Sequence, residues 1–403
     1  MPPPSVDTVS SLPDEILCSI LSLLPTKESV ATTLLSKRWT HLCHRVPDLH
    51  FTDITESNID SLYSFLLSRD TADSNYISIF NLDIQFSHSF DFHSITKCVD
   101  FVVQTRLRLK FLRLHLHHEC NKVLRPQLPF TIFTCKTLTS LSLYWFHTDG
   151  YSFSSNTCQL PLLKILRLEL INFVKIRDFM LFLAGSPILE DLTAFHIYFD
   201  FFRDDSSHTS PEFKSLTWPN LTRLNLSPFC GSSWFMFMVN ALSTSVFLSI
   251  ETNSLYIEDH IVSKINQQCL DDIPMFHNLT HLELHSHWEL VLKVLHLCPN
   301  LQNLQLSQAS KQARWNDKNY LEIFKKPQFV PKCLSLSLTT CAMRDFLGLQ
   351  GDLMLAKYIL KNAKYLQTMS ISSLTELPGI ERKLFACPMA STTCRLSIIH
   401  NKD

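Results

Sequence analysis

Leucines recur along most of this chain in one spacing, Leu-x-x-Leu-x-Leu, and this repeat constrains the fold more than any other feature of the sequence. Successive first leucines are 29, 25, 26, 32, 58 and 22 residues apart. The interval of 58 fits two periods, with a blurred copy near Leu248 or Leu255. A unit of this length buries its leucines only against neighbouring units, so the copies must stack. They begin at Leu109, Leu138, Leu163, Leu189, Leu221, Leu279 and Leu301.

These intervals overlap the ~20–29 residues of a leucine-rich repeat, and the chain from about Tyr76 to Phe324 resembles the leucine-rich-repeat family. The resemblance implies a short strand in each unit, followed by a helix or a looser return segment. An earlier strand is indicated upstream by Ile77, Ile79, Leu82, Ile84 and Phe86. At the ninth repeat position the family commonly has asparagine or cysteine. This chain has other residues there, so we expect an irregular solenoid without an asparagine ladder: His117, Phe146, Ile171, Phe229, His287 and Ala309.

The first fifty residues predict three short helices. Pro13 suits the first turn of a helix, and Asp14 and Glu15 place negative charge at its N-terminus. The apolar stripe that follows ends at Pro25, a second helix begins at Thr26, and a third segment follows Ser36. Three helices this short share only a small core and leave apolar surface for a partner.

The stretch from Leu12 to Phe51 resembles the F-box of plant F-box proteins. It contains a Leu-Pro-Asp-Glu-Ile-Leu opening, a Leu-Pro-Thr-Lys middle and a Leu-Ser-Lys-Arg-Trp ending. The resemblance implies binding to the Skp adaptor of SCF-type ubiquitin ligases; the alternative is a generic helical cap on the repeats. We expect Lys37 and Arg38 to be solvated or to contact the adaptor rim. The residues implied to form the core and the adaptor face are Leu12, Pro13, Ile16, Leu17, Ile20, Leu23, Pro25, Val30, Leu34, Leu35 and Trp39.

The segment from residue 326 to 403 resembles the FBD segment of plant F-box and leucine-rich-repeat proteins. The resemblance lies in Ala356 to Lys364 and in Pro388 to Ile398, although Met389 stands where that family often has arginine. We expect a strand, a helix from Leu353 to Leu366 and two more strands. Because the last unit of a solenoid exposes apolar residues, we interpret this segment as a cap rather than an independent binding domain.

Composition excludes several classes of function. The 36 basic and 37 acidic side chains nearly balance, which disfavours nucleic-acid and membrane-surface binding. The 6 glycines form no phosphate-binding or hydrolase motif. The 13 cysteines include no C-x-x-C pair, and the start of the chain has no secretory pattern. We therefore expect reduced cysteines in an intracellular protein of the nucleus or the cytoplasm, or of both.

Two histidine clusters are the candidates for metal chemistry. One contains His115, His117, His118 and Cys120, and the other contains His277, His281, His285 and His287. Side chains alternate between the two faces of a strand, so His115 and His117 would point away from His118. Nothing in the spacing brings three ligands together. We expect no cofactor, no metal site and no catalytic site.

The same alternation places the residues between the repeat leucines on one exposed sheet face. Arginine and tyrosine are available there as anchors, which suits recognition of a protein segment. The alternative is that these positions are polar only because they face solvent. The candidate target-binding residues are Arg113, His115, Tyr144, Arg167, Glu169, Arg223, His281 and Glu283.

The sequence therefore predicts an α/β protein with a three-helix F-box at residues 1–50, an irregular leucine-rich-repeat solenoid at residues 51–325 and an FBD-like cap at residues 326–403. The resemblances imply a non-catalytic substrate receptor of an SCF-type ubiquitin ligase, with the Skp adaptor and a cullin scaffold as partners. A leucine-rich-repeat scaffold that acts outside any ligase is the alternative, and a metal-dependent hydrolase ranks third.

Overall fold

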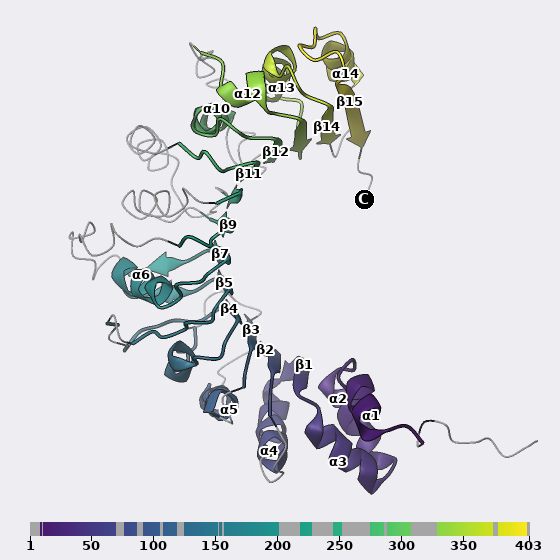
Figure 1. The fold of residues 1–403 in the computed structure, drawn as a ribbon, viewed down its shortest axis with the longest axis vertical. Helices are drawn as coiled ribbons and strands as arrows, with labels where there is room; N and C mark the ends of the chain where they lie inside the picture. The colour runs from purple at the N-terminus through teal and green to yellow at the C-terminus, as the bar shows by residue number, and fades with distance from the viewer. Residues whose placement is uncertain are drawn as a thin grey trace, which may run out of the picture. The chain divides into compact units, whose positions relative to one another are not determined.

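The protein is a mixed α/β molecule of two compact units (Figure 1). One unit contains Met1–Leu189 and Phe199–Asp204, and the other contains Glu190–Tyr198 and Asp205–Asp403. The computed structural model describes residues 9, 11–69, 76–86, 92–104, 108–118, 125–151, 153–154, 157–200, 218–227, 245–251, 275–285, 288–307, 329–373 and 378–400.

The first unit begins with short helices that share a small core. These are α1 (Asp14–Leu21), α2 (Thr26–Ala31), η1 (Thr32–Leu34) and α3 (Lys37–Arg45). Helix α1 begins at Asp14, where the carbonyl of Pro13 accepts the backbone N–H groups of Ile16 and Leu17. The helices bury one common cluster, formed by Leu17, Leu21, Trp39, Leu42 and Val46.

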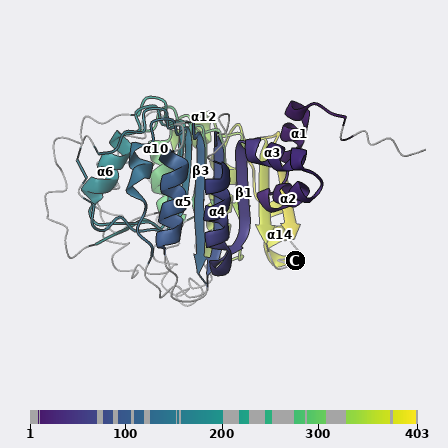
Figure 2. The same ribbon diagram turned by 90° about the horizontal axis from the view of Figure 1, so that it is seen from below.

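Five parallel strands follow in the first unit, each paired with the next along the chain. They are β1 (Asp48–Thr55), β2 (Ile79–Phe86), β3 (Phe111–His118), β4 (Ser140–Tyr144) and β5 (Ile165–Glu169). Figures 1 and 2 show α4 and α5 on one side of these strands. The remaining elements are η2 (Glu56–Asn58), α4 (Ile59–Arg69), α5 (His93–Gln104), η3 (Phe130–Thr134), β6 (Asn172–Phe173) and α6 (Ile176–Ala184).

The second unit repeats this arrangement with eight described parallel strands. They are β7 (Asp191–Phe195), β9 (Arg223–Leu226), β10 (Phe247–Glu251), β11 (His281–His285), β12 (Asn303–Ser307), β13 (Thr340–Arg344), β14 (Thr368–Ser373) and β15 (Arg395–His400). The short strand β8 (Tyr198–Phe199) contains one residue of each unit. The helices are α10 (Trp288–Leu297), α12 (Lys332–Leu336), α13 (Gln350–Asn362) and α14 (Pro378–Phe385).

Strand register places equivalent leucines of neighbouring repeats side by side. Leu112 pairs with Leu141 and Leu141 with Leu166, and all three are buried. Burying a leucine side chain contributes about 1.5–3 kcal/mol, so each row stabilises the stack. The blurred repeat belongs to Leu248, which is buried in β10, while Leu255 lies outside the described residues.

The strand expected upstream of the leucine repeats is β2, which begins at Ile79. In β2 the buried side chains belong to Phe80, Leu82, Ile84 and Phe86, whereas Ile79 is only half-buried. Ile79 is one residue from Phe80, and adjacent strand residues point to opposite faces. Ile79 therefore lies on the polar face of the sheet.

In four of the described repeats, a buried apolar side chain occupies the ninth position, in the turn after the strand. The ninth-position residues Phe146 and Ile171 are buried, as are Ile197 and Phe346 at the same position of other repeats. Of the other predicted positions, His117 lies in β3, and Phe229, His287 and Ala309 lie outside the described residues. The carbonyl of Phe146 accepts the N–H of Asn172, so backbone pairing continues beyond the strands.

The residue before each of these apolar side chains has a left-handed backbone. The φ angles are 71° at Trp145, 55° at Leu170, 49° at His196 and 52° at Asp345. Non-glycine residues adopt this conformation at a cost of about 1–2 kcal/mol. Its recurrence in four repeats shows that the turn geometry is part of the repeat.

The C-terminal segment differs in detail from the predicted order of elements. The first strand was expected in the stretch from Val330 to Cys341, but residues 332–336 of that stretch form helix α12, and the strand β13 begins only at Thr340. Helix α14 is an additional helix. Helix α13 begins at Gln350 and ends at Asn362, earlier than predicted. The buried Asp352 carboxylate accepts the N–H groups of Leu347 and Leu349, and thereby anchors the start of α13.

The three C-terminal strands continue the parallel ladder of the second unit. Leu304 pairs with Cys341, Cys341 with Met369, and Met369 with Leu396. Cysteine and methionine thus occupy positions that leucine occupies in earlier repeats. This substitution hid two further repeats from a search for leucine spacing.

We predict that valine is tolerated at position 344 but not at position 345. Arg344 is an exposed strand residue, so Arg344→Val should change the free energy of unfolding by no more than about 0.5 kcal/mol. Asp345→Val forces a β-branched side chain into the left-handed conformation and should cost about 1–2 kcal/mol. Urea denaturation of both variants measures this difference, and equal midpoints would contradict it.

Candidate interaction surfaces

Most residues implied for adaptor binding are exposed in the structure. Leu17 and Trp39 lie in the small helical core, and Leu12 and Val30 are partly buried. The side chains of Leu34 and Leu23 are the most exposed, at 90% and 85%. Such exposure of large apolar groups within one short segment is the usual mark of a binding surface. The exposed members of the set are Pro13, Ile16, Ile20, Leu23, Pro25, Leu34 and Leu35.

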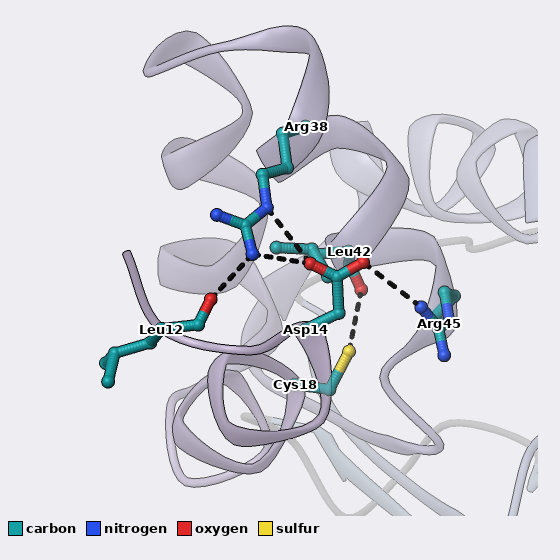
Figure 3. A network of polar contacts seen from close by, with 6 residues as sticks. All are labelled: Leu12, Asp14, Cys18, Arg38, Leu42 and Arg45. Atoms are coloured by element: carbon teal, nitrogen blue, oxygen red, sulfur yellow. Dashed lines mark hydrogen bonds and ion pairs between the residues drawn. The ribbon is translucent and has the colours of Figure 1, made fainter. Parts of the chain in front are cut away.

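A charged network holds the start of α1 against α3 (Figure 3). The Arg38 guanidinium donates to Asp14 Oδ1 at 2.6 Å and to the Leu12 carbonyl at 2.7 Å. Arg45 Nη1 lies 3.5 Å from Asp14 Oδ2, and the Cys18 thiol donates to the Leu42 carbonyl. Hydrogen bonds to ionised groups are stronger than neutral ones. Both Lys37 and Arg38 are exposed, but Arg38 also links α3 to the start of α1.

A buried arginine joins the helical module to the first repeat. Arg69, in the last turn of α4, donates to the carbonyls of Cys43 at 3.0 Å and Val46 at 2.6 Å. These carbonyls lie at the C-terminal end of α3, where positive charge is favourable. Burial lowers the pKa of Arg69 to about 10, so the side chain stays charged at neutral pH. Sequence patterns missed Arg69 because an arginine at a helix end is usually exposed.

The polar sheet face of the first unit brings five predicted target-binding residues together. Arg113 and Arg167 flank Ser142 in one register row, and His115, Tyr144 and Glu169 form the next row. His115 Nε2 lies 2.9 Å from Ser142 Oγ, and its ring stacks on Tyr144 at 5.6 Å between centroids.

Two residues that the sequence analysis did not select share this face. Asp83 pairs with His115 in the register and also lies 3.4 Å from His117 Nε2. The exposed Phe111 adds an aromatic group at the start of β3. Both would have been found by continuing the strand alternation into β2 and β3.

The second unit has a corresponding polar face with the other three predicted residues. Arg223 and His281 flank Phe247 in one row, and Glu283 lies in the next. The Arg223 guanidinium lies 4.6 Å from the centre of the Phe247 ring, a cation–π contact. His281 Nε2 lies 2.8 Å from Asn303 Nδ2. Each predicted residue thus lies on the sheet face of its own unit.

The histidine clusters do not form a metal site in the part of the chain that the structure describes. No group of three His, Cys, Asp or Glu side chains is placed there to hold an ion. His117 approaches Asp83, whereas His118 stacks on Trp145 with ring centroids 5.8 Å apart. Alternation along β3 separates these neighbours. Cys120 and His287 lie outside the described residues.

The ten cysteines of the described ranges are free thiols. Burial raises the pKa of Cys98, Cys158 and Cys333 to about 12, so these thiols stay protonated and unreactive at neutral pH. Within the same ranges, no helix combines the length and the apolar character needed to cross a membrane.

We predict that His115 makes stability depend on pH. Burial and the nearby Arg113 lower the pKa of His115 from 6.5 to about 4. The unfolded chain therefore binds this proton more readily than the folded chain. Stability from His115 is complete above about pH 6.5 and is lost as the pH falls toward 4.

Urea denaturation at pH 7 and pH 5 measures this loss. His115→Gln should lose less stability on acidification than wild type, because the titrating group is gone. His41→Gln, which replaces an exposed histidine of α3, should retain the wild-type loss. Identical losses in wild type and His115→Gln would show that His115 does not contribute.

Three segments of the chain match models of known protein families. Residues 9–51 match the F-box domain, residues 103–218 match the LRR repeats of FBD-associated F-box protein At5g56370, and residues 326–371 match FBD.

Similar proteins from Arabidopsis thaliana cover nearly the whole chain. FBD-associated F-box protein At5g56370 is 27% identical over 91% of this chain and 90% of its own length. F-box/FBD/LRR-repeat protein At1g51370 is 24% identical over 98% of this chain and 96% of its own length. Putative FBD-associated F-box protein At5g56820 is 28% identical over 97% of this chain and 94% of its own length. Each of these alignments therefore covers nine-tenths or more of both chains.

Proposed function

Because the chain belongs to the plant F-box proteins that carry leucine-rich repeats and a C-terminal FBD segment, we propose that it is a substrate receptor of an SCF-type E3 ubiquitin ligase. Residues 1–50 bind the Skp adaptor, which connects the protein to the cullin scaffold. Residues 51–325 form an irregular solenoid that binds the target, and residues 326–403 cap it. The observation that carries the adaptor assignment is the set of exposed apolar side chains in the F-box segment.

The F-box segment divides its apolar residues between folding and binding. Leu17 and Trp39 stabilise the three-helix module from within. Ile20, Leu23 and Leu34 are exposed and available to the adaptor. The polar ties of Arg38 and Arg69 use main-chain carbonyls and Asp14, and so leave these apolar groups uncovered.

In this function the protein positions the target and does not catalyse the transfer of ubiquitin. A target held on the repeats stays near the ubiquitin-conjugating enzyme, which raises its effective concentration. Catalysis belongs to the partner enzymes. The buried protonated thiols suit the reducing interior of the cell, where such ligases act in the nucleus or the cytoplasm.

We predict that acidic substitutions on the exposed F-box side chains abolish adaptor binding without unfolding the chain. Ile20→Asp with Leu34→Asp places charge where apolar burial is needed, so affinity should fall at least about tenfold. Lys27→Glu, also exposed in this segment, should have a much smaller effect. Pull-down with purified Skp adaptor measures this, with circular dichroism as the folding control.

Deletion and alanine variants test the same assignment independently. A chain lacking residues 1–50 should not capture the adaptor, and Leu12→Ala with Pro13→Ala should weaken capture several-fold. Full capture by the deletion variant would favour the alternative, a leucine-rich-repeat scaffold outside any ligase.

We predict that the polar sheet face of the first unit selects the target. Arg167→Glu with Glu169→Arg, or Tyr144→Ala, should remove specific proteins from the set labelled by proximity labelling. Such partly exposed substitutions should cost only about 0.5 kcal/mol of stability. Lys136→Glu, an exposed change outside this face, is the control. An unchanged set of labelled proteins would move target binding elsewhere.

A further inference from the structure

The C-terminal segment has exposed apolar side chains beside its helix-to-strand turns. Leu336, the last residue of α12, is 66% exposed, and Tyr365, between α13 and β14, is 59% exposed. The N–H of Lys364 donates to the carbonyl of Leu334 at 3.0 Å, which brings the two turns together. Phe329, at 77% exposure, precedes α12. We call this set the C-terminal turn surface: Phe329, Val330, Lys332, Leu336, Lys361, Lys364 and Tyr365.

Packing of the repeats does not account for these apolar groups. On α12, Cys333 and Leu334 are the buried residues that contact the core, so Leu336 is not needed there. Leu366, the residue after Tyr365, provides the buried leucine of its repeat. Single exposed apolar side chains are common. Leu336 and Tyr365 lie close to the hydrogen bond between Lys364 and Leu334, and Phe329 and Val330 precede the same short helix, so their exposure is not scattered along the chain.

The charge on the C-terminal turn surface has one sign. Lys332, Lys361 and Lys364 are all exposed, in a chain whose net charge is −1. A lysine in the last turn of a helix is favoured by the helix dipole, which accounts for Lys361. The described acidic residues of this FBD match lie elsewhere: Asp345 follows β13 at its far end, and Asp352 is buried with its carboxylate bonded to backbone N–H groups.

We propose that the C-terminal turn surface binds an acidic protein segment that carries aromatic or aliphatic side chains. Carboxylates of that segment pair with the three lysines, and its apolar side chains pack on Leu336, Tyr365 and Phe329. Aromatic and aliphatic anchors surrounded by polar groups are the usual composition of a protein interface. This binding is separate from both adaptor and target binding as proposed above.

The local structure favours a protein segment over a lipid surface. Helix α12 has only five residues, and part of it is already buried, so it lacks the long amphipathic face of a membrane-bound helix. Three lysines contribute roughly 1 kcal/mol each near an anionic bilayer, which is marginal for membrane binding. A chain laid across two adjacent turns reaches both the lysines and the apolar groups.

The test measures fluorescence anisotropy of short synthetic peptides with the purified full chain. The first peptide contains Asp, Glu, Leu and Phe; the second replaces the acids by Lys, and the third replaces Leu and Phe by Ser. Only the first should bind. Weaker binding at high salt is also expected, because exposed charge pairs are screened.

Matched variants locate the binding site. Lys332→Glu, Lys361→Glu and Lys364→Glu together should weaken binding about tenfold or more, and so should Leu336→Ser with Tyr365→Ser. The control with the same change of charge elsewhere is Lys27→Glu, Lys110→Glu and Lys136→Glu, which should bind as wild type. Circular dichroism verifies folding, and Tyr365→Ser alone serves if a multiple variant unfolds.

Three outcomes would overturn the proposal. One is that the first peptide fails to bind wild type, or binds the variants equally. Another is that phosphatidylserine vesicles, but not the peptide, bind wild type and lose binding to the lysine variant, which would identify a lipid surface. The last is that sedimentation shows self-association that the Leu336→Ser and Tyr365→Ser variant abolishes, which would identify a second copy as the occupant.

Discussion

Parallel pairing of each strand with the strand of the preceding repeat is the constraint on which both units depend. It aligns equivalent side chains in rows, such as Leu248, Leu282 and Leu304 in the second unit. The leucines of one repeat are shielded from water only when the repeats on both sides are present, so no repeat is stable alone.

The same pairing decides which strand side chains stay exposed. Strand residues that alternate with the buried rows cannot be covered by the return helices, so the sheet presents a polar face. In the first unit that face brings His115 and Tyr144 together, with Arg113 and Arg167 in the adjacent row. The helix-to-strand turns form a second kind of surface, because their residues belong neither to the buried rows nor to the polar sheet face.

The module at the N-terminus depends on polar contacts as well as on its small apolar core. Arg38 ties α3 to the start of α1, and Arg69 of α4 ties the end of α3 to the first repeat. Both arginines donate to main-chain carbonyls, so these contacts leave Ile16 and Ile20 of α1 and Leu34 of η1 exposed. An exposed apolar surface on the helical module therefore coexists with an attachment of that module to the first repeat.

The sequence by itself determined the repeat, its leucine rows and the resemblance to F-box, leucine-rich-repeat and FBD segments, because local spacing encodes which side chains share a face. It left the choice between Leu248 and Leu255 open, and the structure placed Leu248 in the buried row. Only the tertiary structure showed that Phe80, and not Ile79, is buried in β2. It also showed that Cys341 and Met369 continue the leucine rows. It also decided that Arg69 is buried. These features depend on the register between strands and on contacts between residues about 25 positions apart. The spacing of residues within one repeat specifies neither.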